Sequence, residues 1–440
     1  MAKIAFMGAG STVFVKNIIG DCMCVPELKG STIALYDIDL NRLQDSQLML
    51  ENINRNLNAG MMIETYLGVD NRRKALVSAD FVFNAVQVGG YEPSTVIDFE
   101  IPKRYGLRQT IADTLGIGGI FRALRTVPVL LDFCHDMEAV CPNALLLNYS
   151  NPMSMLMMGV FRGSGVNAVG LCHSVQSCAG TLLGHCGLNE KYPNPTWKVA
   201  GINHQGWLLE IRDGQRDLYP EITARLTELA AENKLPEWDL VRLDMLKNLG
   251  YYITESSEHN AEYSPWYIKH NYPELIERFR IPLDEYPRRC REQIKGWNEM
   301  RDHALHSDKI EHQRTGEYGS HIVEAVVNNR PYTFGGNVMN SGLIPNLPTK
   351  ACVEVMCIAD GKGITPVYSG DLPEQCAAVN RTMINPQILT TEALLSGKKQ
   401  HVYHAAMLDP HTAAELSVDD IKSMCDELFT AHASMLPQFR

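Results

Sequence analysis

The N-terminal segment, residues 1–39, constrains the fold most because it has the pattern of one complete strand–helix–strand unit. Lys3 to Met7 predicts a short buried strand, and the glycine turn that follows opens a helix running to about Cys24. A second strand is expected from Ser31 to Tyr36. Because strands joined by a helix lie parallel in one sheet, the chain is predicted to be an α/β protein that begins with a Rossmann-like parallel sheet.

The turn after the first strand has the form of a dinucleotide-binding loop. Glycines would let the backbone approach a pyrophosphate, and the helix N-terminus would offer free N–H groups. Position 13 is Val, so the third glycine of the G-x-G-x-x-G fingerprint is missing. The expected cofactor contacts of this loop are Gly8, Gly10, Ser11 and Thr12.

The second strand ends in Asp37-Ile38-Asp39, and an acid at this point can accept hydrogen bonds from ribose hydroxyls. Asp37 is therefore a further cofactor candidate. The alternative is that Asp37 or Asp39 only caps the helix that begins near Leu40.

Polar residues follow two further predicted strands. A buried strand from Ser78 carries Val86 and Gln87 before the pair Gly89-Gly90, and another from Asn143 to Leu147 ends in Asn148-Tyr149-Ser150-Asn151-Pro152. Ligands of doubly wound sheets bind at the carboxyl ends of strands, so Val86, Gln87 and Asn148 are expected beside the cofactor. The alternative for the second group is turn chemistry, since Asn-Pro is a common turn dipeptide.

A glycine-rich segment, residues 109–120, lies between these strands. Three glycines in four positions predict a loop that approaches another group closely, with Asp113 just before it and a helix from Phe121 to Cys141 after it.

Cys172 and His204 each follow a short apolar run, Asn167 to Leu171 and Val199 to Ile202. Cys thiolate and His imidazole suit divalent transition metals, and two protein ligands leave room for substrate and water. The alternatives are a buried structural cysteine and a histidine that only donates or accepts a hydrogen bond.

Residues 250–263 are dense in titratable groups and lack apolar periodicity, which fits either a solvated loop or an active-site wall. Asp284 to Cys290 predicts the start of a helix whose arginines bind substrate or form surface ion pairs. Tyr332 to Val338 and Ala351 to Ile358 are expected to form a small sheet of a second domain, and residues from Thr390 onward are expected to be mostly helical.

The net charge of −11 argues against nucleic acid or an anionic membrane as the main partner. No apolar run reaches the ~18 residues of a membrane span. The 12 cysteines are scattered through a chain of 440 residues, so reduced thiols in a cytoplasmic protein are expected.

These motifs resemble glycoside hydrolase family four, in order and over nearly the whole chain, and within it the bacterial melibiase-type α-galactosidases. The motifs that carry the resemblance are GAGST from residue 8, YDID from 36, VGGYEPSTVIDFE from 88, QTIADTLGIGG from 109, LNYSNPM from 147, GLCHSVQ from 170, AGINH from 200, YYITESSEHNAEY from 251, LDEYPRRC from 283 and AAMLDPHTAAEL from 405.

The resemblance implies an unusual hydrolysis, since this family is a known NAD-dependent exception to the two-carboxylate mechanism. NAD⁺ would accept a hydride from the sugar C3, and a divalent metal, most often Mn²⁺, would stabilise an enediolate while a base removes the C2 proton. The aglycone would then leave C1, water would add, and the hydride would return.

The implied activity is therefore an α-galactosidase that acts on melibiose-like or raffinose-like sugars. The implied fold is a domain like that of lactate and malate dehydrogenases, residues 1–170, joined to a mixed α/β domain for metal, substrate and oligomerisation, residues 171–440. The family usually forms homodimers or homotetramers.

Several positions match residues of the family, and the match implies their roles. Cys172 and His204 would bind the metal, Asn151 and Arg289 the substrate, and Asp113 would support the base, while Gly8, Gly10, Ser11 and Asp37 match the cofactor fingerprint.

The acid and the base depart from the best-known family pattern. His173 stands where phospho-glycosidases of the family have an acidic Asp, and it is either the general acid or a support of the metal site. The family tyrosine that serves as base aligns with Ser256, and its neighbours Glu255, Glu258 and Tyr263 are the other candidates.

Three alternatives remain at this stage. The nearest is a glycosidase of the same family acting on an α-glucoside, an α-galacturonide or a 6-phospho-glycoside. The others are an ordinary NAD-dependent dehydrogenase and a non-catalytic protein that senses NAD.

Overall fold

The computed structural model of the protein describes residues 1–306 and 312–440. Its N-terminal half contains parallel strands, as predicted. They are β1 (Lys3–Met7), β2 (Thr32–Asp37), β3 (Met62–Leu67), β4 (Phe81–Asn84), β5 (Leu145–Asn148) and β6 (Asn167–Gly170). Their spatial order, β3-β2-β1-β4-β5-β6, is that of a doubly wound dinucleotide-binding sheet.

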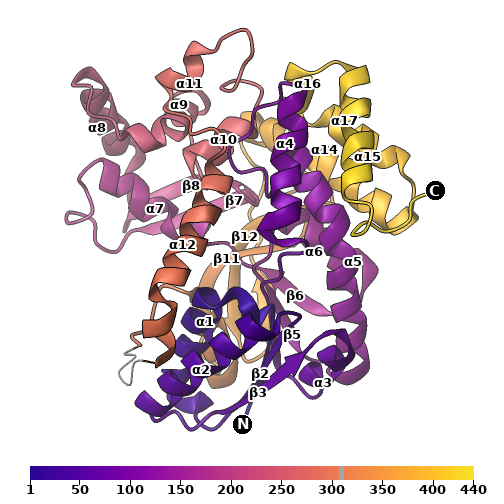
Figure 1. The fold of residues 1–440 in the computed structure, drawn as a ribbon. Coiled ribbons are helices and arrows are strands. Elements are labelled where there is room, and N and C mark those ends of the chain that lie inside the picture. The colour runs from indigo at the N-terminus through magenta and orange to yellow at the C-terminus, as the bar shows by residue number, and fades with distance from the viewer. Residues whose placement is uncertain (307–311) are drawn as a thin grey trace.

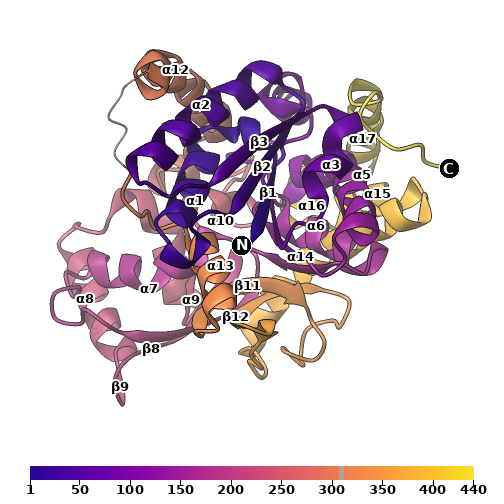
Figure 2. The same ribbon diagram turned by 90° about the horizontal axis from the view of Figure 1, so that it is seen from below.

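Helices cover both faces of this parallel sheet (Figure 2). They are α1 (Val13–Met23), α2 (Leu40–Asn56), α3 (Arg72–Leu76), α5 (Gly116–Val140) and α6 (Met153–Gly163). Helix α4 (Val96–Arg104) packs instead against α5 and the C-terminal helices. Side chains alternate along β1, so Ile4 and Phe6 pack in the core with α1 and α2, whereas Ala5 and Met7 pack in the core with α3, α5 and α6. Burial on both faces explains the nearly continuous apolar sequence of this strand.

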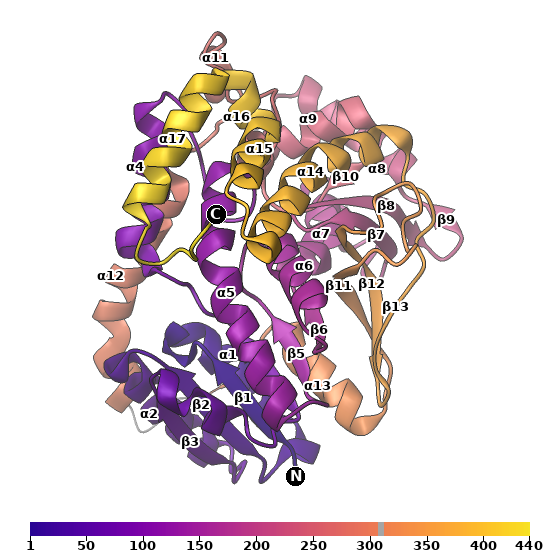
Figure 3. The same ribbon diagram turned by 90° about the vertical axis from the view of Figure 1, so that its right-hand side faces the viewer.

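The second half adds mainly antiparallel strands to the same sheet. They are β7 (Thr196–Ile202), β8 (Gln205–Asp213), β9 (Arg216–Asp217), β10 (Tyr252–Ile253), β11 (Tyr332–Met339), β12 (Cys352–Asp360) and β13 (Gly363–Pro366). The described residues thus form one sheet of 13 strands, in which β10-β8-β7-β12-β11 continues from β6 (Figure 3).

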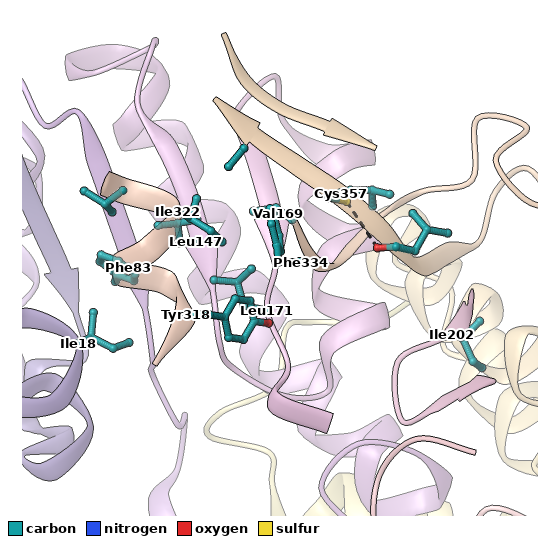
Figure 4. Packing of buried hydrophobic residues seen from close by; sticks show 14 of the residues in the cluster. Ile18, Phe83, Leu147, Val169, Leu171, Ile202, Tyr318, Ile322, Phe334 and Cys357 are labelled. Carbon is teal, nitrogen blue, oxygen red and sulfur yellow. Dashed lines mark hydrogen bonds between the residues drawn. The ribbon is translucent and has the colours of Figure 1, made fainter. Parts of the chain in front are cut away.

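The prediction of a separate small sheet for β11 and β12 was wrong. Asn337 of β11 pairs antiparallel with Gly170 of β6, so β11 covers what would otherwise be the open edge of the parallel half. One hydrophobic core therefore spans both halves of the sheet. Phe83, Leu147 and Val169 from β4, β5 and β6 lie in the same cluster as Phe334 of β11 (Figure 4).

The remaining helices surround the second half. They are α7 (His173–His185), α8 (Tyr219–Ala231), α9 (Leu240–Leu249), α10 (Ser257–Glu262), α11 (Glu274–Arg278), α12 (Glu285–His306), α13 (Tyr318–Asn328), α14 (Glu374–Ser396), α15 (Gln400–Leu408), α16 (Pro410–Glu415) and α17 (Val418–Ala431). The C-terminal helices pack beside α4 and α5 of the first half, and α12 descends to α2 (Figure 1). No helix among the described residues has both the length and the apolar character needed to cross a membrane.

Two boundaries differ from the sequence prediction. The predicted glycine-rich loop is in part the first turn of α5, where a Cβ atom on Gly118 would lie 2.4 Å from the carbonyl oxygen of Ala112. The glycines are therefore needed for close packing of the helix start against the preceding chain. Strand β4 stops at Asn84, level with the ends of its partners at Met7 and Asn148, so Val86 and Gln87 lie in the loop beyond it.

Candidate active site

A cavity of about 640 Å³ lies where the parallel strands end. The carboxyl ends of β1, β4, β5 and β6 lead into it, as expected for a doubly wound sheet. The residues that these loops contribute to its wall include Ser11, Phe14, Val86, Gln87, Ser150, Asn151, Cys172 and His173. The loops predicted to carry cofactor, substrate and metal contacts therefore meet at one site.

The glycine loop after β1 is shaped for close approach. Gly8 has φ 89°, and a Cβ atom on it would lie 2.9 Å from the carbonyl carbon of Ala85. A Cβ atom on Gly10 would lie 2.8 Å from the Asp37 carboxylate, which accepts a hydrogen bond from the Gly10 N–H at 2.6 Å. The buried Ser11 hydroxyl has no protein partner among the described residues. A polar group without a partner at the start of a helix fits a phosphate-bearing cofactor.

The two acids after β2 have different partners in the structure. Asp39 is the N-cap of α2 and accepts a hydrogen bond from the Arg42 N–H, whereas Asp37 binds the glycine loop. Two other cofactor candidates, Thr12 and Asn148, do not line the cavity. Thr12 caps α1 through its backbone position, and the buried Asn148 accepts a hydrogen bond from Asn84 at 2.7 Å.

Three possible metal ligands converge at the far side of the cavity. The donor atoms of Cys172, His204 and Glu255 all lie within 4.8 Å of one another. Glu255 Oε2 is 3.9 Å from Cys172 Sγ and 3.3 Å from His204 Nε2. One soft thiolate, one imidazole and one carboxylate form a donor set that fits a divalent transition metal.

Local backbone geometry presents these ligands. Cys172 lies two residues after β6 as the N-cap of α7, and His204 is in the two-residue turn between β7 and β8. His204 and Glu255 both have left-handed backbone conformations, with φ 63° and 64°. Such conformations are costly for residues other than glycine and are often found at functional sites.

Neighbouring groups hold the ligands in forms that bind metal. Tyr263 Oη lies 3.2 Å from His204 Nδ1, which leaves Nε2 directed toward Glu255. Burial lowers the pKa of His204. Burial alone would raise the pKa of Glu255, but His204 and His259 lower it to about 2. Burial thus favours the neutral imidazole, the form that binds a metal, and the Glu255 carboxylate is charged near neutral pH.

The thiol of Cys172 is in a different electrostatic position. Burial, together with the nearby carboxylates of Glu255 and Glu354, raises its pKa well above the ordinary value. A bound cation would offset both effects, since it stabilises a thiolate and compensates the acidic neighbours. The surroundings of Cys172 thus fit a metal ligand better than a free reactive thiol.

His173 has a hydrogen-bond partner, Glu317, that the sequence did not predict. Its Nε2 atom lies 2.7 Å from Oε2 of Glu317, just before α13. The hydrogen bond that the Glu317 carboxylate accepts raises the pKa of His173. The ring packs near Tyr149 and Tyr318, with centroids 5.7 and 6.1 Å away, and it lines the cavity.

The other candidate residues divide between two places. Asp113, Asn151 and Ser256 line the main cavity, where the Asn151 amide lies 3.5 Å from Asp113 and the Ser256 hydroxyl lies 2.5 Å from His259 Nδ1. Glu258 and Arg289 are paired with each other and line an adjoining cavity. Tyr263 is buried behind His204 and lines neither cavity.

Several wall residues were missed in the sequence. Arg122 and Tyr286 face the cavity together, with the guanidinium 5.8 Å from the ring centroid. Tyr286 lies in the segment 284–290, from which the sequence predicted only Arg289 as a site residue. Arg122 lies in a helix whose sequence does not indicate which face is functional. Trp238 and Arg242 also line the cavity, and nothing in the sequence marked them.

Comparison with known proteins gives consistent matches. The model for the family 4 glycosyl hydrolases matches residues 3–187, and the model for their C-terminal domain matches residues 199–412. An alpha-galactosidase of Bacillus subtilis (strain 168) is 56% identical over 440 residues, which covers all of both chains.

Solved structures confirm the predicted fold class. A 6-phospho-alpha-glucosidase from gut microorganisms, solved in complex with NAD and Mn²⁺, is 20% identical with a TM-score of 0.80. The match covers 100% of both chains. Lactate dehydrogenase from Eimeria maxima, solved with NADH and oxamate, is 14% identical with a TM-score of 0.51, over 90% of this chain and 96% of that one. At these identities the likeness concerns the fold.

Proposed function

We propose a function on the basis that the chain belongs to the family 4 glycosyl hydrolases. It hydrolyses α-galactosides of the melibiose or raffinose type and uses NAD⁺ and a divalent metal, of which Mn²⁺ is the first candidate. The name of the Bacillus subtilis relative supports the galactoside. One observation carries the proposal: the glycine loop and the donor set of Cys172, His204 and Glu255 open into the same cavity.

The proposed cofactor contacts follow from the site. Gly8, Gly10, Ser11 and Thr12 form the dinucleotide loop, and Asp37 accepts a hydrogen bond from it. Asn148 is buried at the end of β5, and Val86 and Gln87 lie toward the sugar. Cys172 and His204 hold the metal, with Glu255 as a third ligand. When bound, NAD⁺ supplies a reversible hydride acceptor and the metal supplies a Lewis acid.

The side chains around the sugar would bind it and move protons. Asn151 and Asp113 orient a sugar hydroxyl beside the donor set. His173, paired with Glu317, donates a proton to the leaving oxygen on C1. Ser256 takes the C2 proton as its own hydroxyl proton passes to His259 Nδ1, which lies 2.5 Å away, and both residues face the cavity.

A neutral galactoside is preferred to a phosphorylated sugar because the cavity's buried cations are already compensated. Arg242 donates to Asp239 at 2.5 Å, and Arg122 lies near the carboxylate of Asp113. We further propose a cytoplasmic homodimer or homotetramer, with the dinucleotide domain at 1–170 and the metal and substrate domain at 171–440.

The test is a panel of nitrophenyl glycosides assayed with NAD⁺, Mn²⁺ and a thiol. Nitrophenyl α-galactoside should be cleaved only when both cofactors are present, with deuterium exchange at C2 and without net NADH. Preferred cleavage of an α-glucoside, an α-galacturonide or a 6-phospho-glycoside would replace the substrate assignment. Net NADH formation would instead indicate an ordinary dehydrogenase.

A further inference from the structure

A second cavity, of about 380 Å³, opens beside the first. The two cavities share the wall residues Trp238, Glu255 and Ser256. The rest of the second wall comes from residues 241–289, and its apolar part consists of Val241, Phe279, Ile281 and Pro282. Its size lies within the range of small-molecule sites, ~300 to 1,000 Å³, as does its mixture of apolar walls with a few polar groups.

The position of this cavity relative to the metal ligands constrains its use. In the proposed reaction the C2 oxygen of galactose faces the donor set that includes Glu255, and C3 faces the dinucleotide end at Val86 and Gln87. C1 is bonded to C2 on the side away from C3, so the leaving group extends away from the dinucleotide. The second cavity meets the first at Glu255, and its described wall includes neither Val86 nor Gln87.

We infer that the second cavity is the subsite for the leaving group and that it takes a neutral saccharide, an inference that rests on the proposed function. Trp238 forms the boundary between the sugar that is oxidised and the sugar that departs.

The indole of Trp238 is suited to this position. Trp238 is 58% exposed, but one side of its ring packs against neighbouring side chains. The Arg242 guanidinium lies 5.9 Å from the ring centroid, and the ring of His185 has its centroid 4.9 Å away. A fixed aromatic ring that remains exposed in a cavity offers an apolar face for the C–H groups of a sugar and an N–H donor for a hydroxyl.

Polar groups in the same wall match hydroxyls rather than anions. Arg289 donates to Glu285 at 2.7 Å and also pairs with Glu258, so two carboxylates compensate its charge. Arg280 lies 3.5 Å from Glu237. Three carboxylates, those of Glu255, Glu258 and Glu285, line the second cavity together with two guanidinium groups. A phosphate or uronate leaving group would find no uncompensated guanidinium in the described part of this wall, whereas hydroxyls find both donors and acceptors.

The test compares two galactosides that differ only in the leaving group, melibiose and methyl α-galactoside, with the full-length enzyme, NAD⁺ and Mn²⁺. Trp238→Ala should lower kcat/KM for melibiose by about tenfold and change that for methyl α-galactoside by less than about twofold. Trp238→Phe, which keeps a ring, should retain most of the melibiose activity. Arg289→Lys should raise KM for melibiose more than for the methyl glycoside, because lysine cannot replace the planar, doubly paired guanidinium.

Trp266→Ala is the matched control, since Trp266 is also exposed but lines neither cavity. Binding without turnover gives a second readout: calorimetry with Mn²⁺ and no NAD⁺ should give a weaker melibiose affinity in Trp238→Ala and an unchanged affinity for methyl α-galactoside. Equal losses on both substrates in Trp238→Ala would overturn the subsite. If the unaltered enzyme cleaves no α-galactoside at all, the proposed function fails instead, and the two failures are distinguishable.

Discussion

The Nε2 atom of His173 lies 2.7 Å from the Oε2 atom of Glu317, a residue 144 positions further along the chain. If His173 donates the proton to the leaving oxygen, Glu317 orients the ring and stabilises its protonated form. Glu317→Gln should then lower kcat for melibiose by about tenfold, a typical cost of losing such a supporting partner, with KM nearly unchanged.

Nitrophenyl α-galactoside provides the discriminating measurement for this pair. Nitrophenolate departs with little help from an acid, so Glu317→Gln should affect it much less than melibiose. Glu324→Gln, in the helix α13 that follows Glu317, is the control. Glu324 is paired with Arg314, and its substitution should leave both rates near those of the unaltered enzyme. Equal effects of Glu317→Gln on the two substrates would exclude the acid role.

Cys172→Ser should abolish hydrolysis and leave NAD⁺ binding measurable. A serine hydroxyl is not deprotonated as a thiolate is, so the softest of the three donors is lost. Equilibrium dialysis with Mn²⁺ and fluorescence titration with NADH measure the two sites separately. Cys24→Ser serves as the control, because Cys24 lies outside both cavities. Undiminished hydrolysis by Cys172→Ser would contradict the metal assignment.

Gly10→Ala should have the opposite selectivity, with weakened NAD⁺ binding and nearly normal Mn²⁺ binding. The new Cβ atom would lie 2.8 Å from Asp37 Oδ2 and would displace the carboxylate that holds the loop. A loss of at least about tenfold in NAD⁺ affinity is expected, since the loop must approach the pyrophosphate closely.

Gly180→Ala is the matched control for this change. A Cβ atom on Gly180 meets no atom within 4 Å, so this substitution within α7 should leave cofactor affinity unchanged. Unaltered NAD⁺ binding by Gly10→Ala would contradict the proposed cofactor loop.

The difference between what the sequence predicted and what it could not predict has a physical cause. Cys172 and His204 could be identified because each follows an apolar run and because a thiolate and an imidazole together suit a divalent transition metal. Their third partner, Glu255, was recognised as a titratable candidate, but its position beside them depends on a left-handed turn after β10. Contacts set by tertiary packing leave no local pattern, which is why Glu317 and Trp238 were missed.

The same reasoning applies to the sheet. Alternation and turns predicted β11 and β12 as strands, but the pairing of Asn337 with Gly170 joins segments 167 residues apart, as their side-chain to backbone hydrogen bond also does. Register between distant strands depends on which edge is free in the folded molecule. The sequence therefore predicted the elements and not the continuous sheet that places His204 opposite Cys172.

Asp21, at the C-terminal part of α1, gives a prediction for stability and pH. Its buried carboxylate accepts hydrogen bonds from the N–H and hydroxyl of Thr315, at 2.9 and 2.7 Å, and lies 2.8 Å from His312 Nε2. Burial alone would raise the pKa of Asp21, but His312 and Thr315 together hold it below its ordinary value.

A carboxyl whose pKa is lower in the folded than in the unfolded chain stabilises the fold above the unfolded pKa of about 3.9, and that contribution is lost as the pH falls through the folded pKa. Asp21→Asn should therefore lower Tm at pH 7 by about 2 to 4 °C. The difference in Tm between the variant and the unaltered protein should become smaller as the pH falls below about 3.9. Calorimetric scans across this pH range test the prediction, with exposed Asp70→Asn as the control. A gap that stays constant with pH would mean that the ionised carboxylate of Asp21 does not stabilise the fold.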